Sequence, residues 1–230
     1  RFWTVIGFGA ACRPAPVRIP LRSCPAGVQR AERMATERRD MDRRASGAAA
    51  WIAPGHRSDK PEDLLLRPRL PNGRRVSDRR LLALFRRCAG LGRGMRVLEI
   101  GCGRSRWLPC LALSFGCRMS GVEVDSYAAE LARANLAGAG VSGEILCRDA
   151  FDISANRDLE YRYDLVYSLG LMEHFSDPAQ RLAVLSRYLK PGGRLLTTVP
   201  NLHGVNGMLQ RLASLHRLNM HRVYDKRRLA

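Results

Sequence analysis

Residues 97–105 read Val-Leu-Glu-Ile-Gly-Cys-Gly-Arg-Ser, and this stretch decides the fold. Its apolar residues predict a buried strand, its two glycines predict a tight turn, and Ser105 is placed as the N-cap of a following helix. Gly101 and Gly103 tolerate positive φ and let a ligand approach the backbone closely. The pattern predicts a nucleotide-cofactor loop with an acidic residue, Glu99, at its entrance.

The same loop argues against a dinucleotide. A pyrophosphate-binding loop carries a third glycine in the spacing G-x-G-x-x-G, and Arg106 occupies that position. A carboxylate at Glu99 suits a cationic or amino-bearing ligand better than a phosphate. Because a lone G-x-G turn can also be purely structural, the following segments must decide.

Strands alternate with helices along the rest of the chain. Strands are predicted at 97–100, 117–124, 143–147, 163–168 and 194–199, and helices at 107–115, 127–138 and 178–189. This alternation predicts an α/β fold with a Rossmann-like, doubly wound, mostly parallel sheet that is covered on both faces.

Acidic residues stand near the ends of the second and third predicted strands. Glu123 follows the first glycine by about 20 residues, the place from which a carboxylate can bind both hydroxyls of a ribose. Asp149, beside Ala150 and Phe151, can hold a purine ring and its exocyclic amine. The alternatives are a solvated carboxylate and a turn residue. Asp125 is assigned to the cap of the next helix.

Five segments occur in one order over residues 95–201: VLEIGCGRS, GVEVD, CRDAF, YDLVYSLGLMEHF and LKPGGRLLTTVPN. In these the chain resembles the class I S-adenosylmethionine-dependent methyltransferases that act on small molecules, of the methyltransferase type 11/12 kind. Glu123 departs from the commoner Asp, which keeps the charge and lengthens the reach.

The resemblance implies S-adenosylmethionine as cofactor. Its methionine part would lie by the glycine loop, its ribose by Glu123, its adenine by Asp149, and its sulfonium above the turn that follows the fourth strand. The cofactor-binding residues implied are Glu99, Gly101, Cys102, Gly103, Glu123, Val124, Asp149, Ala150, Phe151, Ser168 and Leu169. Cys102 is interpreted as a small packing residue of the loop and not as a nucleophile.

His174 follows the fourth predicted strand by a few residues, on the side where open α/β sheets bind ligands. An imidazole there can accept the proton of a methyl acceptor, so His174 is the candidate catalytic base. The alternative is that Glu173 and His174 shape this loop or cap the next helix. No metal site is predicted, because the seven cysteines show no C-x-x-C pair and no zinc spacing.

The implied function is methyl transfer to an O, N or C atom of a small-molecule acceptor. Two alternatives stay open: a catalytically inactive binding module or fragment of the same fold, and an RNA methyltransferase. Residues 1–96 carry 22 Lys and Arg against 8 Asp and Glu, whereas residues 97–230 carry 17 against 13. The near balance of the core makes nucleic acid an unlikely partner, because a basic groove belongs beside the active site.

Four parts of the chain are distinguished. Residues 1–50 are rich in Arg, Ala, Pro and Gly without sustained periodicity and are expected to be disordered. Residues 51–94 are expected to be helical and to cover the substrate. Within them, a helix is expected to begin with the cap Ser77-Asp78. Residues 95–201 form the cofactor-binding core, and residues 202–230 a helical segment.

Two further expectations concern the surroundings of the core. Only about 30 residues follow Asn201, so the last two strands of the family's seven-stranded sheet are expected to be missing, the chain to be truncated, and residues 195–199 to form an open edge. No segment approaches the ~20 apolar residues of a membrane span, so no membrane partner is expected. An odd number of cysteines within predicted strands and helices indicates buried thiols and a cytoplasmic location. The oligomeric state is left without a prediction.

Overall fold

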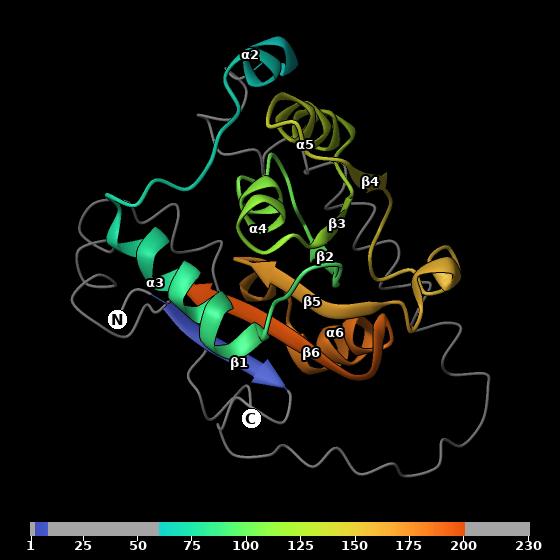
Figure 1. Cartoon of the computed structure of the whole chain (residues 1–230). Coiled ribbons are helices and arrows are strands. Elements are labelled where there is room, and N and C mark those ends of the chain that lie inside the picture. The colour runs from blue at the N-terminus through green and yellow to red at the C-terminus, as the bar shows by residue number, and fades with distance from the viewer. Residues whose placement is uncertain (1–2, 9–59, 201–230) are drawn as a thin grey trace, which may run out of the picture. The chain divides into compact units, whose positions relative to one another are not determined.

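The computed structural model describes residues 3–8 and 60–200 (Figure 1). Their strands form one six-stranded sheet in the order β1-β6-β5-β2-β3-β4. The bounds are β1 Trp3–Phe8, β2 Arg96–Ile100, β3 Arg118–Glu123, β4 Gly143–Cys147, β5 Tyr163–Leu169 and β6 Leu189–Pro200. Strands β2 to β6 are parallel to their neighbours, and β1 runs antiparallel to β6. The doubly wound, mostly parallel sheet expected from the sequence is confirmed.

Helices connect the parallel strands. Their bounds are α2 Pro61–Leu66, α3 Val76–Leu84, α4 Trp107–Phe115, α5 Ser126–Gly138 and α6 Pro178–Ser186, with short helical turns at Phe85–Ala89 (η2, a π-helical turn), Arg157–Leu159 (η3) and Met172–His174 (η4). The chain winds outward from β2 through β3 to β4 and then returns to place β5 on the other side of β2. This reversal creates a switch point at the carboxyl ends of β2 and β5, where open α/β sheets bind ligands.

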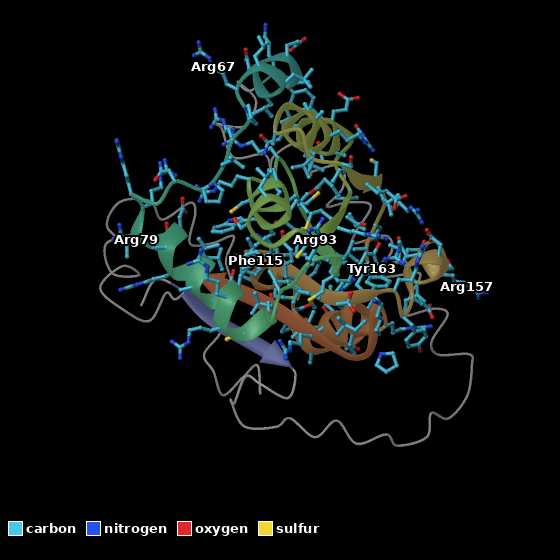
Figure 2. The ribbon with its side chains drawn as sticks, viewed as in Figure 1. Arg67, Arg79, Arg93, Phe115, Arg157 and Tyr163 are labelled. Atoms are coloured by element: carbon cyan, nitrogen blue, oxygen red, sulfur yellow. The ribbon has the colours of Figure 1, made fainter. Side chains whose placement is uncertain are left out.

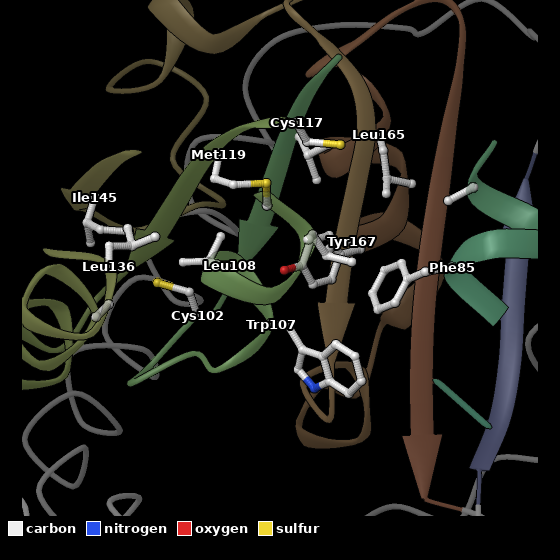
Figure 3. Packing of buried hydrophobic residues seen from close by; sticks show 14 of the residues in the cluster. Phe85, Cys102, Trp107, Leu108, Cys117, Met119, Leu136, Ile145, Leu165 and Tyr167 are labelled. Atoms are coloured by element: carbon white, nitrogen blue, oxygen red, sulfur yellow. The ribbon is translucent and has the colours of Figure 1, made fainter. Parts of the chain in front are cut away.

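Alternate residues of the central strands enter two separate cores. On one face, strand residues such as Val97 and Tyr167 pack with side chains of η2, α4 and α5 (Figure 3). On the other face, Leu98 and Val166 pack with side chains of α6. The central strands β2 and β5 therefore bury both sides of their pleat, which explains why their sequences are nearly continuous in apolar residues.

The open edge expected at residues 195–199 is absent. Strand β1 pairs with β6 along the whole of this stretch, from Phe8 opposite Leu195 to Trp3 opposite Pro200. The prediction of an unpaired edge was wrong, and so was the prediction of disorder for residues 3–8. The physical reason is that an apolar run far away in the sequence supplies the missing backbone partners. Residues 9–59 and 201–230, including the segment predicted for 202–230, lie outside the described residues.

The predicted cap at Ser77-Asp78 is also corrected. Helix α3 begins at Val76, and the Asp78 side chain is buried at 3% exposure. Its carboxylate accepts two hydrogen bonds from the Arg106 guanidinium, at 2.7 and 2.9 Å, and one from the Asn72 backbone N–H at 3.0 Å. Asp78 therefore joins α3 to the start of α4 instead of capping its own helix. Among the described helices, none has the length and apolarity needed to cross a membrane.

Candidate active site

The glycine loop is fastened to the strand beside it. Gly101 and Gly103 both have positive φ, at 66° and 47°, as their residue type predicts. The Gly101 N–H donates to the Val122 carbonyl at 2.8 Å, and the Gly103 N–H donates to Glu123 Oε2 at 2.7 Å. A Cβ on Gly103 would have no atom within 4 Å, so this part of the loop faces open space. A cradle of this kind lets a ligand lie directly on the backbone.

Ser105 links the loop to the helix that follows it. Its Oγ accepts hydrogen bonds from the N–H groups of Trp107 and Leu108, both at 3.1 Å, and donates to the Glu99 carboxylate. The capping role predicted for Ser105 is thus confirmed, although α4 formally begins two residues later. The same hydroxyl fixes the orientation of Glu99.

Glu99 is a buried carboxyl group at the end of β2. The Tyr167 hydroxyl, on the neighbouring strand β5, donates to Glu99 Oε2 at 2.8 Å. Burial raises the pKa of Glu99 from 4.5 to about 8, against the opposing effect of the hydrogen bonds from Ser105 and Tyr167. At neutral pH Glu99 therefore holds a proton that a nearby cation can displace.

Glu123 ends β3 and organises the turn around it. Its carboxylate accepts from the backbone N–H groups of Gly103, Val124 and Asp125, at 2.7, 2.9 and 3.1 Å. Burial raises the pKa of Glu123 above its ordinary value, although these three hydrogen bonds oppose the shift. Asp125 accepts from the Ala128 N–H at 2.7 Å and caps α5, as predicted.

The predicted purine corner follows β4. Asp149 accepts from the Phe151 N–H at 2.8 Å, and burial raises its pKa. The Phe151 ring meets the Phe175 ring edge to face at 5.0 Å, and the Arg181 guanidinium lies 4.8 Å from both ring centres. Phe175 belongs to the segment after β5. Two loops that are distant in the sequence thus share one aromatic contact.

Ala150, Cys102, Ser168 and Leu169 contribute less through their side chains than their place in the motifs suggests. Ala150 is buried, and its carbonyl accepts from the Tyr188 hydroxyl. Cys102 is buried at 5% exposure, and its thiol pKa is raised well above the usual range by burial, which agrees with a packing role. Ser168 hydrogen-bonds with Thr197 at 2.7 Å inside the sheet, and Leu169 packs against the core on the α4 face.

His174 lies in η4, a turn that begins three residues after the end of β5. The His174 backbone N–H donates to the Leu171 carbonyl at 3.2 Å. The neighbouring Glu173 is 2% exposed, and its Oε2 has no hydrogen-bond partner among the residues that the structure describes. Burial raises the pKa of Glu173 from 4.5 to about 7. Sequence reasoning treated Glu173 only as a loop residue, because no periodic pattern marks a buried carboxyl group.

Two polar anchors escaped the sequence analysis altogether. Asn135 on α5 is fully buried and binds both backbone groups of Arg69, with its Nδ2 donating also to the Ser105 carbonyl at 2.8 Å. The second anchor is the pair formed by Asp78 and Arg106. Both tie the segment before β2 to the cofactor loop. An Asn within an apolar helical stripe is the one sequence signal that points to such an anchor.

Along the carboxyl ends of adjacent strands, the structure thus brings together Glu99, Glu123, Asp149 and a glycine turn. In the described part of the chain, no group of three or more His, Cys, Asp or Glu is arranged to hold a metal ion. Carboxylates spaced along a sheet edge suit an ammonium group, a ribose diol and an exocyclic amine. They do not suit a pyrophosphate.

A family model described as "Methyltransferase domain" matches residues 73–230. The chain belongs to this methyltransferase family. The match begins at the segment that carries α3 and includes every residue of the site described above. The matched residues thus include the glycine loop and the strand ends that carry Glu99, Glu123 and Asp149.

Individual relatives are more distant. The ubiquinone biosynthesis O-methyltransferase of Thiobacillus denitrificans is 30% identical over 116 residues, which cover 50% of this chain and 49% of that protein. Methyltransferase GfsG of Streptomyces halstedii is 30% identical over 105 residues, 44% of this chain and 36% of that protein. The chain spans about half the length of the curated relatives it matches.

A solved structure supports the fold. The [4+2]-cyclase SpnF superimposes with a TM-score of 0.54 at 21% identity, over 66% of this chain and 53% of that one. At this identity the likeness concerns the fold alone.

Proposed function

We propose that this chain binds S-adenosylmethionine and transfers its methyl group to a small-molecule acceptor. The observation that carries the proposal is Glu123, whose half-buried carboxylate accepts the Gly103 N–H and so fixes the glycine turn. Membership of the methyltransferase family supports it. The name of the Thiobacillus relative, an O-methyltransferase, supports an oxygen acceptor.

The residues present fit this cofactor. Open space beside Gly103 admits a ligand against the backbone, and the Glu99 carboxyl group can lose its proton and pair with a cation. Glu123 and Val124 would bind the ribose. The methionine part would be held by Glu99, Gly101, Cys102 and Gly103. The adenine would be held by Asp149, Ala150 and Phe151. The backbone at Ser168 and Leu169 would lie below the sulfonium.

The bound cofactor supplies an electrophilic methyl group on a positively charged sulfur. The protein's own work is therefore to place the acceptor atom in line and to exclude water, which can account for about 7–11 kcal/mol of the barrier in favourable cases. We place the acceptor above the turn after β5. Residues 51–94 would cover the acceptor. The described part of this segment is held to the cofactor loop by the hydrogen bonds of Asn135 and Asp78.

We assign the acceptance of the acceptor's proton to His174. His174→Ala is expected to lower kcat by about 10²–10⁴-fold and to remove one limb of the pH profile of kcat/KM, with cofactor affinity unchanged. Glu173→Gln is the matched neighbour, because its carboxyl group has a pKa of about 7. If the limb disappears in Glu173→Gln and persists in His174→Ala, the assignment to His174 is incorrect.

The proton on Glu99 predicts how affinity depends on pH. A bound ammonium group stabilises the ionised carboxylate, so binding releases a proton below the Glu99 pKa of about 8. We expect the affinity for S-adenosylhomocysteine to increase between about pH 6 and 8, by at most about tenfold per unit. Calorimetry across this range checks it. The same slope in Glu99→Gln would show that another group supplies the proton.

The overall function is tested by incubating the chain with S-adenosylmethionine labelled in the methyl group and a panel of catechols, phenols and amines. Labelled product that requires the folded chain supports methyl transfer. Cofactor binding without transfer to any acceptor would leave a binding module. We also propose a cytoplasmic location, supported by the free thiols of Cys88, Cys102, Cys110, Cys117 and Cys147.

A further inference from the structure

The segment from Leu65 to Arg80 exposes both leucine and arginine side chains, from the end of α2 to the start of α3. Seven large apolar side chains are exposed in the described part of the chain, and four of them lie here: Leu65 at 49%, Leu66 at 83%, Leu70 at 42% and Val76 at 43%. Six exposed arginines alternate with them: Arg67, Arg69, Arg74, Arg75, Arg79 and Arg80. We call these ten side chains the Leu/Arg face.

From Leu65 to Arg80 the exposed charge is of one sign, whereas Glu62 and Asp63, which are also exposed, precede this stretch on α2. The single acidic residue between Leu65 and Arg80 is Asp78, which is 3% exposed and paired with Arg106. Arg67 points outward from the ribbon (Figure 2), whereas the exposed Arg79 guanidinium donates to the backbone carbonyls of Gly73 and Arg74 at 3.0 and 3.5 Å. The face therefore presents positive charge beside aliphatic surface.

The backbone that carries the face is fixed from beneath. Leu64 is buried at 2% exposure and packs with Leu131 and Ala134 of α5. Asn135 binds the backbone of Arg69 at 2.6 and 3.0 Å. Because the segment contacts the rest of the fold on one side, its exposed leucines lie on the other side. A rigid display of apolar side chains marks a surface that binds something.

The chemistry of the face selects its partner. Single-stranded nucleic acid is bound by aromatic side chains that stack on bases, and the sequence from Leu65 to Arg80 contains no aromatic residue. Aliphatic side chains flanked by arginines are typical of proteins that lie on anionic bilayers, where the leucines enter the interface and the arginines bind phosphate groups. A surface of this kind requires no membrane-spanning segment.

We infer that the Leu/Arg face docks this protein on an anionic phospholipid surface. The expectation of no membrane partner rests on spanning segments alone, and docking on a bilayer surface requires none. The ten side chains belong to the segment 51–94 that is proposed to cover the acceptor, but none of them is among the residues assigned to cofactor binding or proton transfer. The inference therefore does not depend on the identity of the methyl acceptor or on cofactor binding.

The test is co-sedimentation of the full chain with vesicles of phosphatidylcholine, with and without phosphatidylglycerol. We expect binding to the anionic vesicles that weakens steeply with salt, and little binding to phosphatidylcholine alone. Leu65→Ser combined with Leu66→Ser should weaken binding at least about tenfold, because the apolar anchor is lost. Arg74→Glu combined with Arg75→Glu should weaken it to a similar extent.

Leu113→Ser is the matched control, because Leu113 is 59% exposed and lies on α4, outside the face. It should bind vesicles like the unaltered chain, and circular dichroism should show that all variants are folded. No binding to anionic vesicles would overturn the inference. So would binding that the Leu65 and Arg74 variants leave unchanged, or tighter binding of RNA by the same face.

Discussion

Glu123→Ala is expected to weaken the binding of S-adenosylmethionine and S-adenosylhomocysteine by at least about 100-fold. Without the carboxylate, the bound ligand would lose two charge-assisted hydrogen bonds to its ribose, each worth about 1.5–3 kcal/mol. The substitution would also leave the Gly103 N–H without its acceptor at 2.7 Å, so the glycine turn itself would loosen. Isothermal titration of both ligands measures the change.

Glu123→Asp is the matched control for this experiment. It keeps the charge and shortens the side chain by one methylene, so it should retain affinity within about tenfold. Circular dichroism establishes that both variants are folded. Unchanged affinity in a folded Glu123→Ala chain would show that the ribose does not lie at the end of β3.

Phe85→Ala is expected to lower the free energy of unfolding by about 3–5 kcal/mol. Phe85 is fully buried, and its ring lies 5.1 Å from the Tyr167 ring and 5.6 Å from the Trp107 ring (Figure 3). Removal of the ring leaves a cavity between the η2 turn, β5 and the start of α4. Urea unfolding followed by tryptophan fluorescence measures the loss.

Two variants bound this result. Phe85→Leu refills part of the cavity and should cost clearly less than the alanine variant. Leu113→Ala, at an exposed position of α4, should change stability by no more than about 0.5 kcal/mol. A loss below about 1 kcal/mol in Phe85→Ala would mean that η2 is not part of the cooperative core.

Those parts of the site that depend on local sequence were predictable. Gly101, Gly103 and Glu123 were found because a strand end, a turn and a fixed spacing are properties of neighbouring residues. Parallel pairing then brought the ends of β2 and β3 together without further information. The capping roles of Ser105 and Asp125 follow from the same local rules.

Features that depend on distant partners were not predictable. Asn135 bonds to a residue 66 positions away, and Asp78 to one 28 positions away. Asp78 has the sequence context of a helix cap, yet the half-buried guanidinium of Arg106 offers it stronger hydrogen bonds than a helix terminus does. Glu173 shows no pattern at all, since its burial results from the packing of η4 against the rest of the fold.

Strand β1 has a consequence for the order in which the protein is assembled on the ribosome. Its partner β6 is translated roughly 190 residues later, which at about 5–20 residues per second is a delay of roughly 10–40 s. During that time the nascent strand exposes backbone groups that must wait for β6. Among the described strands, the pairing of β1 with β6 thus joins the two that are translated furthest apart in time, and a chaperone that shields emerging segments would act on β1 during this interval.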